Sequence, residues 1–147
     1  MKRSRIIMLV LFALTVTPIA IYNNWSNFLM GGRATTFNLA VSSVYMFAWF
    51  IFSLIWGVKK ERAYQKFIKI YWGTHFVYFI IAAISTNVAS LLLPLMLWYG
   101  GPMYGINYFT NSTIVIFSTI ALLGPLVSAS GYWIGLKISK TSKPVRM

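Results

Sequence analysis

Few side chains of this protein are of the types that catalyse reactions or bind metals. The 147-residue sequence has no cysteine, one histidine, His75, and one acidic residue, Glu61. One chain therefore cannot supply a thiolate metal site, a carboxylate pair or a Ser-His-Asp triad. An axial pair of haem ligands would need a second histidine from a symmetric dimer. We expect no enzymatic activity, no metal and no cofactor.

Three polar residues within apolar stretches form a candidate polar site: Asn38, Ser42 and His75. Asn38 and Ser42 are one helical turn apart, so we expect them to hydrogen-bond to a neighbouring helix, and lining a polar path is the alternative. We interpret His75 as a neutral, hydrogen-bonded residue, with a proton relay or a ligand contact as the alternative. Glu61 lies among basic residues and is interpreted as a member of an ion pair. Coupled transporters usually place a carboxylate within a span, and this sequence offers none there.

Small residues recur near the C-terminal end of the chain with the period of a helix. They are spaced 3, 4, 3 and 4 apart, at Ala121, Gly124, Ser128, Gly131 and Gly135. Such a stripe allows another backbone to approach closely, which drives helix association in lipid. We predict a helix-packing face here, either within the bundle or against a second copy or another protein.

Basic residues in the middle of the chain follow a similar period. They are spaced 3, 4 and 3 apart, at Lys59, Arg62, Lys66 and Lys69, and would share one helical face. Each basic residue near an anionic membrane surface contributes about 1 kcal/mol of attraction. We predict that these four contact anionic headgroups. The alternatives are charge that only sets the topology and a surface for an acidic partner protein.

The composition excludes a soluble globular domain. Hydrophobic residues make up 59% of the chain and charged residues 10%, whereas soluble domains carry about 25% charge. The same hydrophobicity excludes intrinsic disorder. The formal net charge of +12 would suit a polyanion-binding protein, so the position of the charges decides its meaning.

Uncharged stretches long enough to cross a bilayer recur along the chain. A bilayer core about 30 Å thick needs about 20 helical residues. We predict spans at residues 6–22, 34–58, 70–90 and 113–136, none of which contains a charged residue. Basic residues before the first stretch also suit a secretory signal peptide. We favour a span because the apolar run is long for a signal peptide and no typical cleavage site follows it.

The segment between the third and fourth predicted spans, residues 91–112, has no charge but several helix breakers, including Pro94 and Pro102. If it crossed the membrane, the basic residues would divide 8 to 5 between the two sides. Without that crossing, 12 of the 13 lie on one side and only Arg33 lies on the other. The positive-inside rule favours the second arrangement, with the loop 59–69, the tail 137–147 and both termini in the cytoplasm. Residues 91–112 are then an uncharged outer segment, either interfacial or re-entrant.

The sequence therefore predicts an all-α integral membrane protein, a four-transmembrane-helix bundle that forms a single domain over residues 1–147. We expect it in the bacterial cytoplasmic membrane. The predicted role is non-enzymatic, as an accessory or partner-binding component of a membrane complex. Its predicted partners are anionic lipids and either another membrane protein or a second copy. The alternative is an oligomeric pore or carrier, either holin-like or transporting small solutes or lipids. We expect no nucleic-acid binding, because the basic residues are divided among three short segments.

Overall fold

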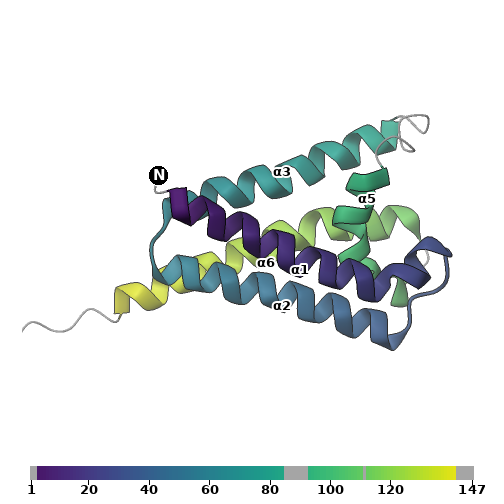
Figure 1. The fold of residues 1–147 in the computed structure, drawn as a ribbon, viewed down its shortest axis with the longest axis horizontal. Coiled ribbons are helices and arrows are strands. Elements are labelled where there is room, and N and C mark those ends of the chain that lie inside the picture. The colour runs from purple at the N-terminus through teal and green to yellow at the C-terminus, as the bar shows by residue number, and fades with distance from the viewer. Residues whose placement is uncertain (1–2, 85–92, 111, 142–147) are drawn as a thin grey trace, which may run out of the picture.

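Four long helices and a short helical segment make up the part of the fold that the structure describes. The computed structural model describes residues 3–84, 93–110 and 112–141, and these residues contain helices and no strand. The long helices are α1 (Arg3–Leu29), α2 (Thr36–Val58), α3 (Arg62–Ile84) and α6 (Thr113–Thr141). Successive long helices run in opposite directions along the long axis of the molecule (Figure 1). The short segment between α3 and α6 consists of α5 (Leu93–Gly100) and the 3-10 helix η1 (Gly101–Tyr108).

Three of the long helices are long and apolar enough to cross a membrane. They comprise residues Ser4–Leu29, Thr36–Val58 and Ser118–Thr141. The four predicted spans are thus supported only in part, because α3 does not meet this standard over its described residues. Its first two turns carry Arg62, Lys66 and Lys69, and residues 85–90 of the predicted span 70–90 lie outside the described residues.

The boundary between α2 and α3 is a Schellman motif, a common helix C-terminus. The Lys60 N–H donates to the Gly57 carbonyl at 2.9 Å, and the Glu61 N–H donates to the Trp56 carbonyl at 3.2 Å. Lys60 has a φ of 55°, in the left-handed region that favours glycine. The helix restarts at Arg62, so most of the predicted loop 59–69 belongs to α3.

The helix α6 packs most closely against α2, and the small residues of α6 make this approach possible. A Cβ atom added at Gly131 would lie 2.5 Å from the Phe50 carbonyl oxygen, and one added at Gly135 would lie 2.7 Å from the Val58 nitrogen. All five residues of the predicted stripe are buried. The stripe therefore faces other helices of the same chain.

Aromatic side chains fill the space between α1, α2 and α3. Trp49 of α2 is fully buried at their centre. Its ring lies 5.2 Å from that of Phe12 on α1 and 4.9 Å from that of Tyr71 on α3, measured between ring centroids. These contacts attach α3 to the bundle, although it diverges from the other helices toward its C-terminal end (Figure 1).

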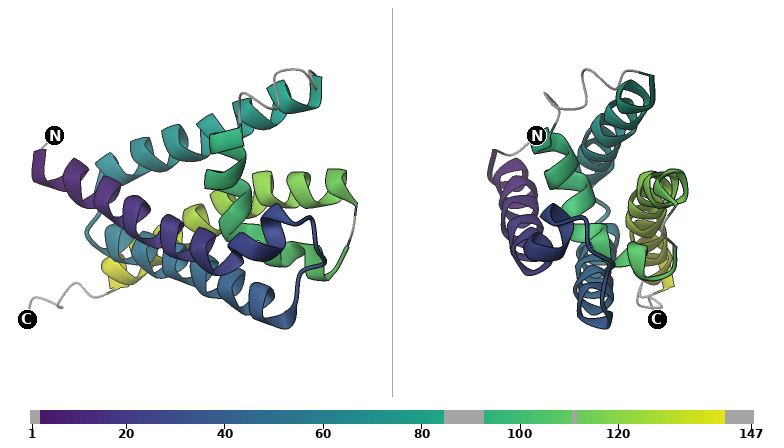
Figure 2. Two further views of the ribbon diagram at one scale, coloured as in Figure 1. Left: turned by 45° about the vertical axis from the view of Figure 1, so that its right-hand side comes forward. Right: turned by 90° about the vertical axis from the view of Figure 1, so that its right-hand side faces the viewer.

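The segment formed by α5 and η1 lies among the long helices at one end of the bundle (Figure 2). Residues 99–105 are all buried, and η1 packs against both α1 and α2. Residues 99–105 of the predicted outer segment 91–112 thus lie in the protein interior. Residues 91, 92 and 111 lie outside the described part of the chain.

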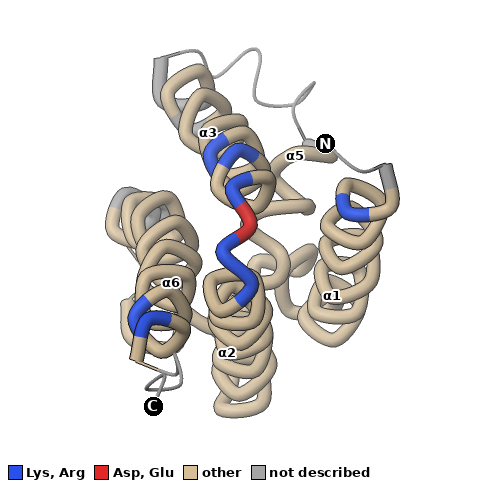
Figure 3. The backbone as a smooth tube through the Cα atoms, turned by 90° about the vertical axis from the view of Figure 1, so that its left-hand side faces the viewer, with Lys and Arg blue, Asp and Glu red and all other residues tan. Residues whose placement is uncertain are grey.

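Basic residues gather at the opposite end of the bundle. The start of α1, the connection between α2 and α3, and the end of α6 meet there, and all three carry Lys or Arg (Figure 3). Glu61 lies among them, and its carboxylate forms an ion pair with the Arg5 guanidinium at 2.5 Å. The structure thus joins basic segments that are far apart in the sequence.

Candidate functional site

Two features of the bundle bear on function: a polar clamp that holds η1 and a groove between α3 and α6. The clamp consists of Asn24 on α1 with Asn38 and Ser42 on α2. The Asn24 amide donates to the carbonyl oxygens of Gly101, at 2.8 Å, and Pro102, at 3.3 Å. The Asn38 amide donates in turn to the Asn24 side-chain oxygen at 3.0 Å.

Ser42 completes the clamp. Its hydroxyl donates to the Pro102 carbonyl at 2.8 Å and accepts from the Gly105 N–H at 2.9 Å. Gly105 lies so close to α2 that an added Cβ would meet the Leu39 Cα at 2.6 Å. Buried backbone N–H and carbonyl groups need hydrogen-bond partners, and these side chains supply them for η1.

The predicted polar site is thus divided by the structure. Asn38 and Ser42 lie together in the clamp, but His75 lies against α5. Its ring is 2% exposed and stacks on the Tyr99 ring at a centroid distance of 4.5 Å. Asn24 is not part of the predicted polar site, and the sequence signal for it is the polar run at residues 23–27 beside the first predicted span.

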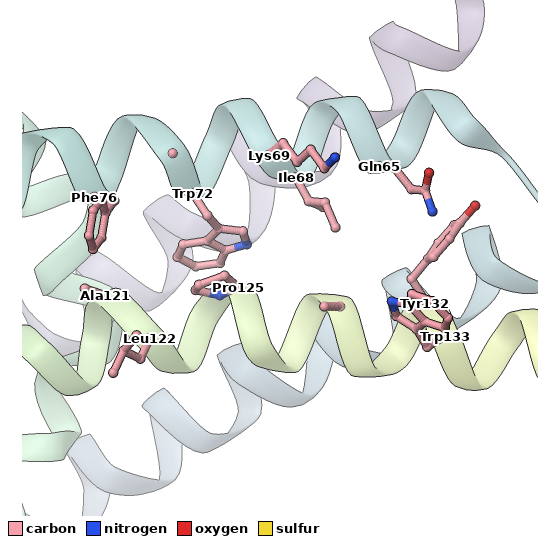
Figure 4. Close-up of a pocket in the computed structure, with 12 residues that line it drawn as sticks. Gln65, Ile68, Lys69, Trp72, Phe76, Ala121, Leu122, Pro125, Tyr132 and Trp133 are labelled. Carbon is pink, nitrogen blue, oxygen red and sulfur yellow. The ribbon is translucent and has the colours of Figure 1, made fainter.

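The groove lies between α3 and α6 and has a volume of about 540 Å³. The side chains that line it are mainly apolar. Positions on one face of α3 line it, from Gln65 through Trp72 to Phe76, and facing positions of α6 line it from Ala121 to Trp133 (Figure 4). Phe76 is 49% exposed and Leu122 is 58% exposed. The groove is therefore open to the surroundings of the bundle.

Trp72 of α3 contacts α6 within the groove. Its indole N–H donates to the Ser128 hydroxyl at 3.0 Å. The six-membered part of the ring lies directly over Gly124, where a Cβ would not fit. On the α3 side, a Cβ added at Gly73 would meet no atom within 4 Å. Gly73 therefore borders open space within the groove.

A second hollow continues the groove at the basic end of the molecule. We call it the basic cup; its volume is about 450 Å³, and its lining residues are Lys60, Arg62, Gln65, Tyr132, Leu136 and Lys140. Gln65 and Tyr132 line both the cup and the groove. Tyr132 rises from α6 toward Gln65 on α3 (Figure 4), so these two residues mark the junction.

The four basic residues predicted to contact lipid occupy different places. Arg62 lines the cup, and Lys69 lines the groove. Lys59 follows the end of α2, where its ammonium lies 5.6 Å from the centre of the Trp56 ring, and Lys66 is exposed on α3. The four do not share one helical face, because the Schellman motif separates Lys59 from α3.

Among the described residues, no group of three or more His, Cys, Asp or Glu side chains could hold a metal ion. Comparison with known protein families, with curated proteins and with solved structures finds no match for this chain. The geometry of the groove, the cup and the clamp is therefore the basis for assigning a function.

Proposed function

We propose that this chain is a non-enzymatic membrane protein that binds another membrane component in the groove between α3 and α6. In this proposal it is an accessory or partner-binding component of a membrane complex in the bacterial cytoplasmic membrane. The observation that carries the proposal is a mainly apolar groove that is open along the side of the bundle and ends in a basic cup. The predicted small-residue stripe is buried within the chain, so it offers less surface for a partner.

The proposal includes four crossings with both termini in the cytoplasm. Three helices meet the length and hydropathy expected of a span. The helix α3 has 23 described residues, about 34 Å of helix, and runs antiparallel to α2. A crossing by α3 brings the basic segments to one side, as the positive-inside rule requires.

An oligomeric pore or carrier is the second candidate function, and it receives less support. A polar path would need polar side chains that are free to face it. Asn24 and Ser42 instead hydrogen-bond to the backbone of η1, and the Asn38 amide donates to the Asn24 side chain.

Site-specific photo-crosslinking in native membranes tests the proposed function. A photoreactive diazirine amino acid replaces Gly73, which borders open space in the groove. The matched control replaces the next residue, Thr74, which is exposed and does not line the groove. One dominant adduct at position 73, absent at position 74, supports the proposal. The same broad mixture of adducts at both positions, or no adduct at position 73, contradicts it.

A further inference from the structure

We propose that the groove and the basic cup together bind one anionic phospholipid. An acyl chain lies along the groove, and the phosphate lies in the cup. This inference rests on the proposed function and names the class of the bound component.

The charge of the cup favours a phosphate. Lys60, Arg62 and Lys140 contribute three cations, and no acidic side chain lines the cup. Glu61 is adjacent to two of them in the sequence, but its carboxylate is paired with Arg5 at 2.5 Å. A guanidinium donates two parallel hydrogen bonds to phosphate oxygens, and basic pockets between transmembrane helices bind anionic headgroups.

The dimensions of the groove favour an acyl chain. Gln65 and Phe76 are eleven residues apart on α3, which corresponds to about 17 Å of helix. One leaflet contributes about 15 Å to the hydrocarbon core. The groove thus extends from the basic end to about the middle of the bilayer, and its apolar part begins where the cup ends.

The polar side chains at the junction suit the ester region of a phospholipid, which lies between the phosphate and the acyl chains. Gln65 and Tyr132 line both hollows, between the cations and the apolar part of the groove. Their amide and hydroxyl groups are in a position to hydrogen-bond to the ester region. Apart from Lys69, a further cation that lines the groove, the order of charged, polar and apolar groups along the site is the order found along a phospholipid.

The backbone at Lys60 adds an observation that is independent of the hollow. Its φ of 55° favours glycine, yet the chain carries a lysine there, and that lysine lines the cup. A residue held in a disfavoured backbone conformation is often explained by function. Here the lysine provides a cation to the cup.

Relative binding of two spin-labelled lipids tests the inference. The intact chain is reconstituted in phosphatidylcholine vesicles, and electron paramagnetic resonance measures the motionally restricted fraction of labelled phosphatidylglycerol and of labelled phosphatidylcholine. One cation contributes about fivefold in affinity, so we expect phosphatidylglycerol to be preferred by about tenfold or more. Added inorganic phosphate should not displace it, because the acyl chain contributes to binding.

Two triple variants with equal changes in net charge locate the site. Replacing Lys60, Arg62 and Lys140 by glutamine should reduce the preference for phosphatidylglycerol by at least about tenfold. The control variant has glutamine in place of Lys59, Lys66 and Lys137, which do not line the cup. This variant should reduce the preference for phosphatidylglycerol by less than about threefold. Circular dichroism verifies that both variants retain the helix content of the wild type.

Blocking the groove provides the third comparison. Gly73→Leu adds a side chain where no atom lies within 4 Å, and Thr74→Leu adds the same side chain outside the groove. We expect only Gly73→Leu to remove the restricted fraction of phosphatidylglycerol.

Three results would overturn the inference. The first is equal binding of the two lipids by the wild type, and the second is an equal loss of preference in the two triple variants. The third is a change in oligomeric state with Gly73→Leu, which would identify a helix of a second copy as the occupant. A dominant crosslink at position 73 would sustain the proposed function in each case, so failure of the lipid assignment can be distinguished from failure of the groove as a binding site.

Discussion

The clamp on η1 leads to a prediction about two adjacent serines. Ser42 is buried and forms two hydrogen bonds with η1, to the Pro102 carbonyl at 2.8 Å and from the Gly105 N–H at 2.9 Å. Ser43 is exposed and donates only to the Leu39 carbonyl of its own helix, at 2.8 Å. The same change to alanine should therefore have very different effects at the two positions.

The expected loss of stability follows from the hydrogen bonds that the Ser42 hydroxyl makes. Ser42→Ala removes the hydroxyl that accepts from the buried Gly105 N–H, and an orphaned N–H costs about 1–3 kcal/mol. It also removes the shorter of two hydrogen bonds to the Pro102 carbonyl, worth about 0.5–1.5 kcal/mol, while the Asn24 amide still donates to that carbonyl at 3.3 Å. Water cannot readily replace the hydroxyl, since Gly105 lies in close contact with the α2 backbone. Interhelical hydrogen bonds in membranes contribute less on average, about 0.6 kcal/mol, because unfolded chains also find partners there. We expect Ser42→Ala to lower the free energy of unfolding by about 2–4 kcal/mol and Ser43→Ala to change it by less than about 0.5 kcal/mol.

Reversible unfolding in mixed micelles measures this difference. The mole fraction of sodium dodecyl sulfate is raised, and circular dichroism at each step reports the remaining helix. The wild type and both variants are compared under one condition, so the midpoint and slope give the change in free energy. Equal stability of Ser42→Ala and Ser43→Ala would refute the assignment of Ser42 as a support of η1.

Three further substitutions test other parts of the structure. Gly135→Leu should destabilise the fold by about 3 kcal/mol or more, because its Cβ would lie 2.7 Å from the Val58 nitrogen; a wild-type midpoint in the same unfolding assay would contradict this packing. Glu61→Gln should cost about 0.5–1 kcal/mol at low salt, since the ion pair with Arg5 is partly exposed, and an effect that persists at high salt would argue against an electrostatic cause. Lys60→Gly should raise the free energy of unfolding by about 0.5–1 kcal/mol, because glycine adopts the left-handed conformation without strain and this gain outweighs the greater entropy of the unfolded glycine chain. The same substitution should decrease the preference for phosphatidylglycerol. A loss of stability would show that Lys60 is not strained.

The helices were the most predictable part of this protein. Hydropathy predicted a span at residues 34–58, and α2 is Thr36–Val58. The spacing of Gly131 and Gly135 indicated a face that allows close approach, and both lie against the backbone of α2. Periodicity reveals such features because they depend on residues within a single helix.

Contacts between distant segments were not predictable in the same way. Asn24 hydrogen-bonds to a carbonyl 77 residues away, and no local pattern encodes that pairing. The basic cup draws Lys60 and Arg62 from one segment and Lys140 from another. The prediction that Lys59 and Arg62 share a face requires one continuous helix through residue 60, and the left-handed residue Lys60 interrupts that helix.

The crossing by α3 is the central claim, because the groove and the proposed orientation both depend on it. The natural chain has no cysteine, so single cysteines can be labelled in intact cells with a membrane-impermeant reagent. Phe109→Cys, after α3 and η1, replaces a residue that is 72% exposed, and Lys66→Cys replaces an exposed residue at the start of α3. We expect labelling at position 109 in intact cells and labelling at position 66 only after the cells are permeabilised. Labelling of both positions, or of neither, in intact cells would contradict the crossing by α3.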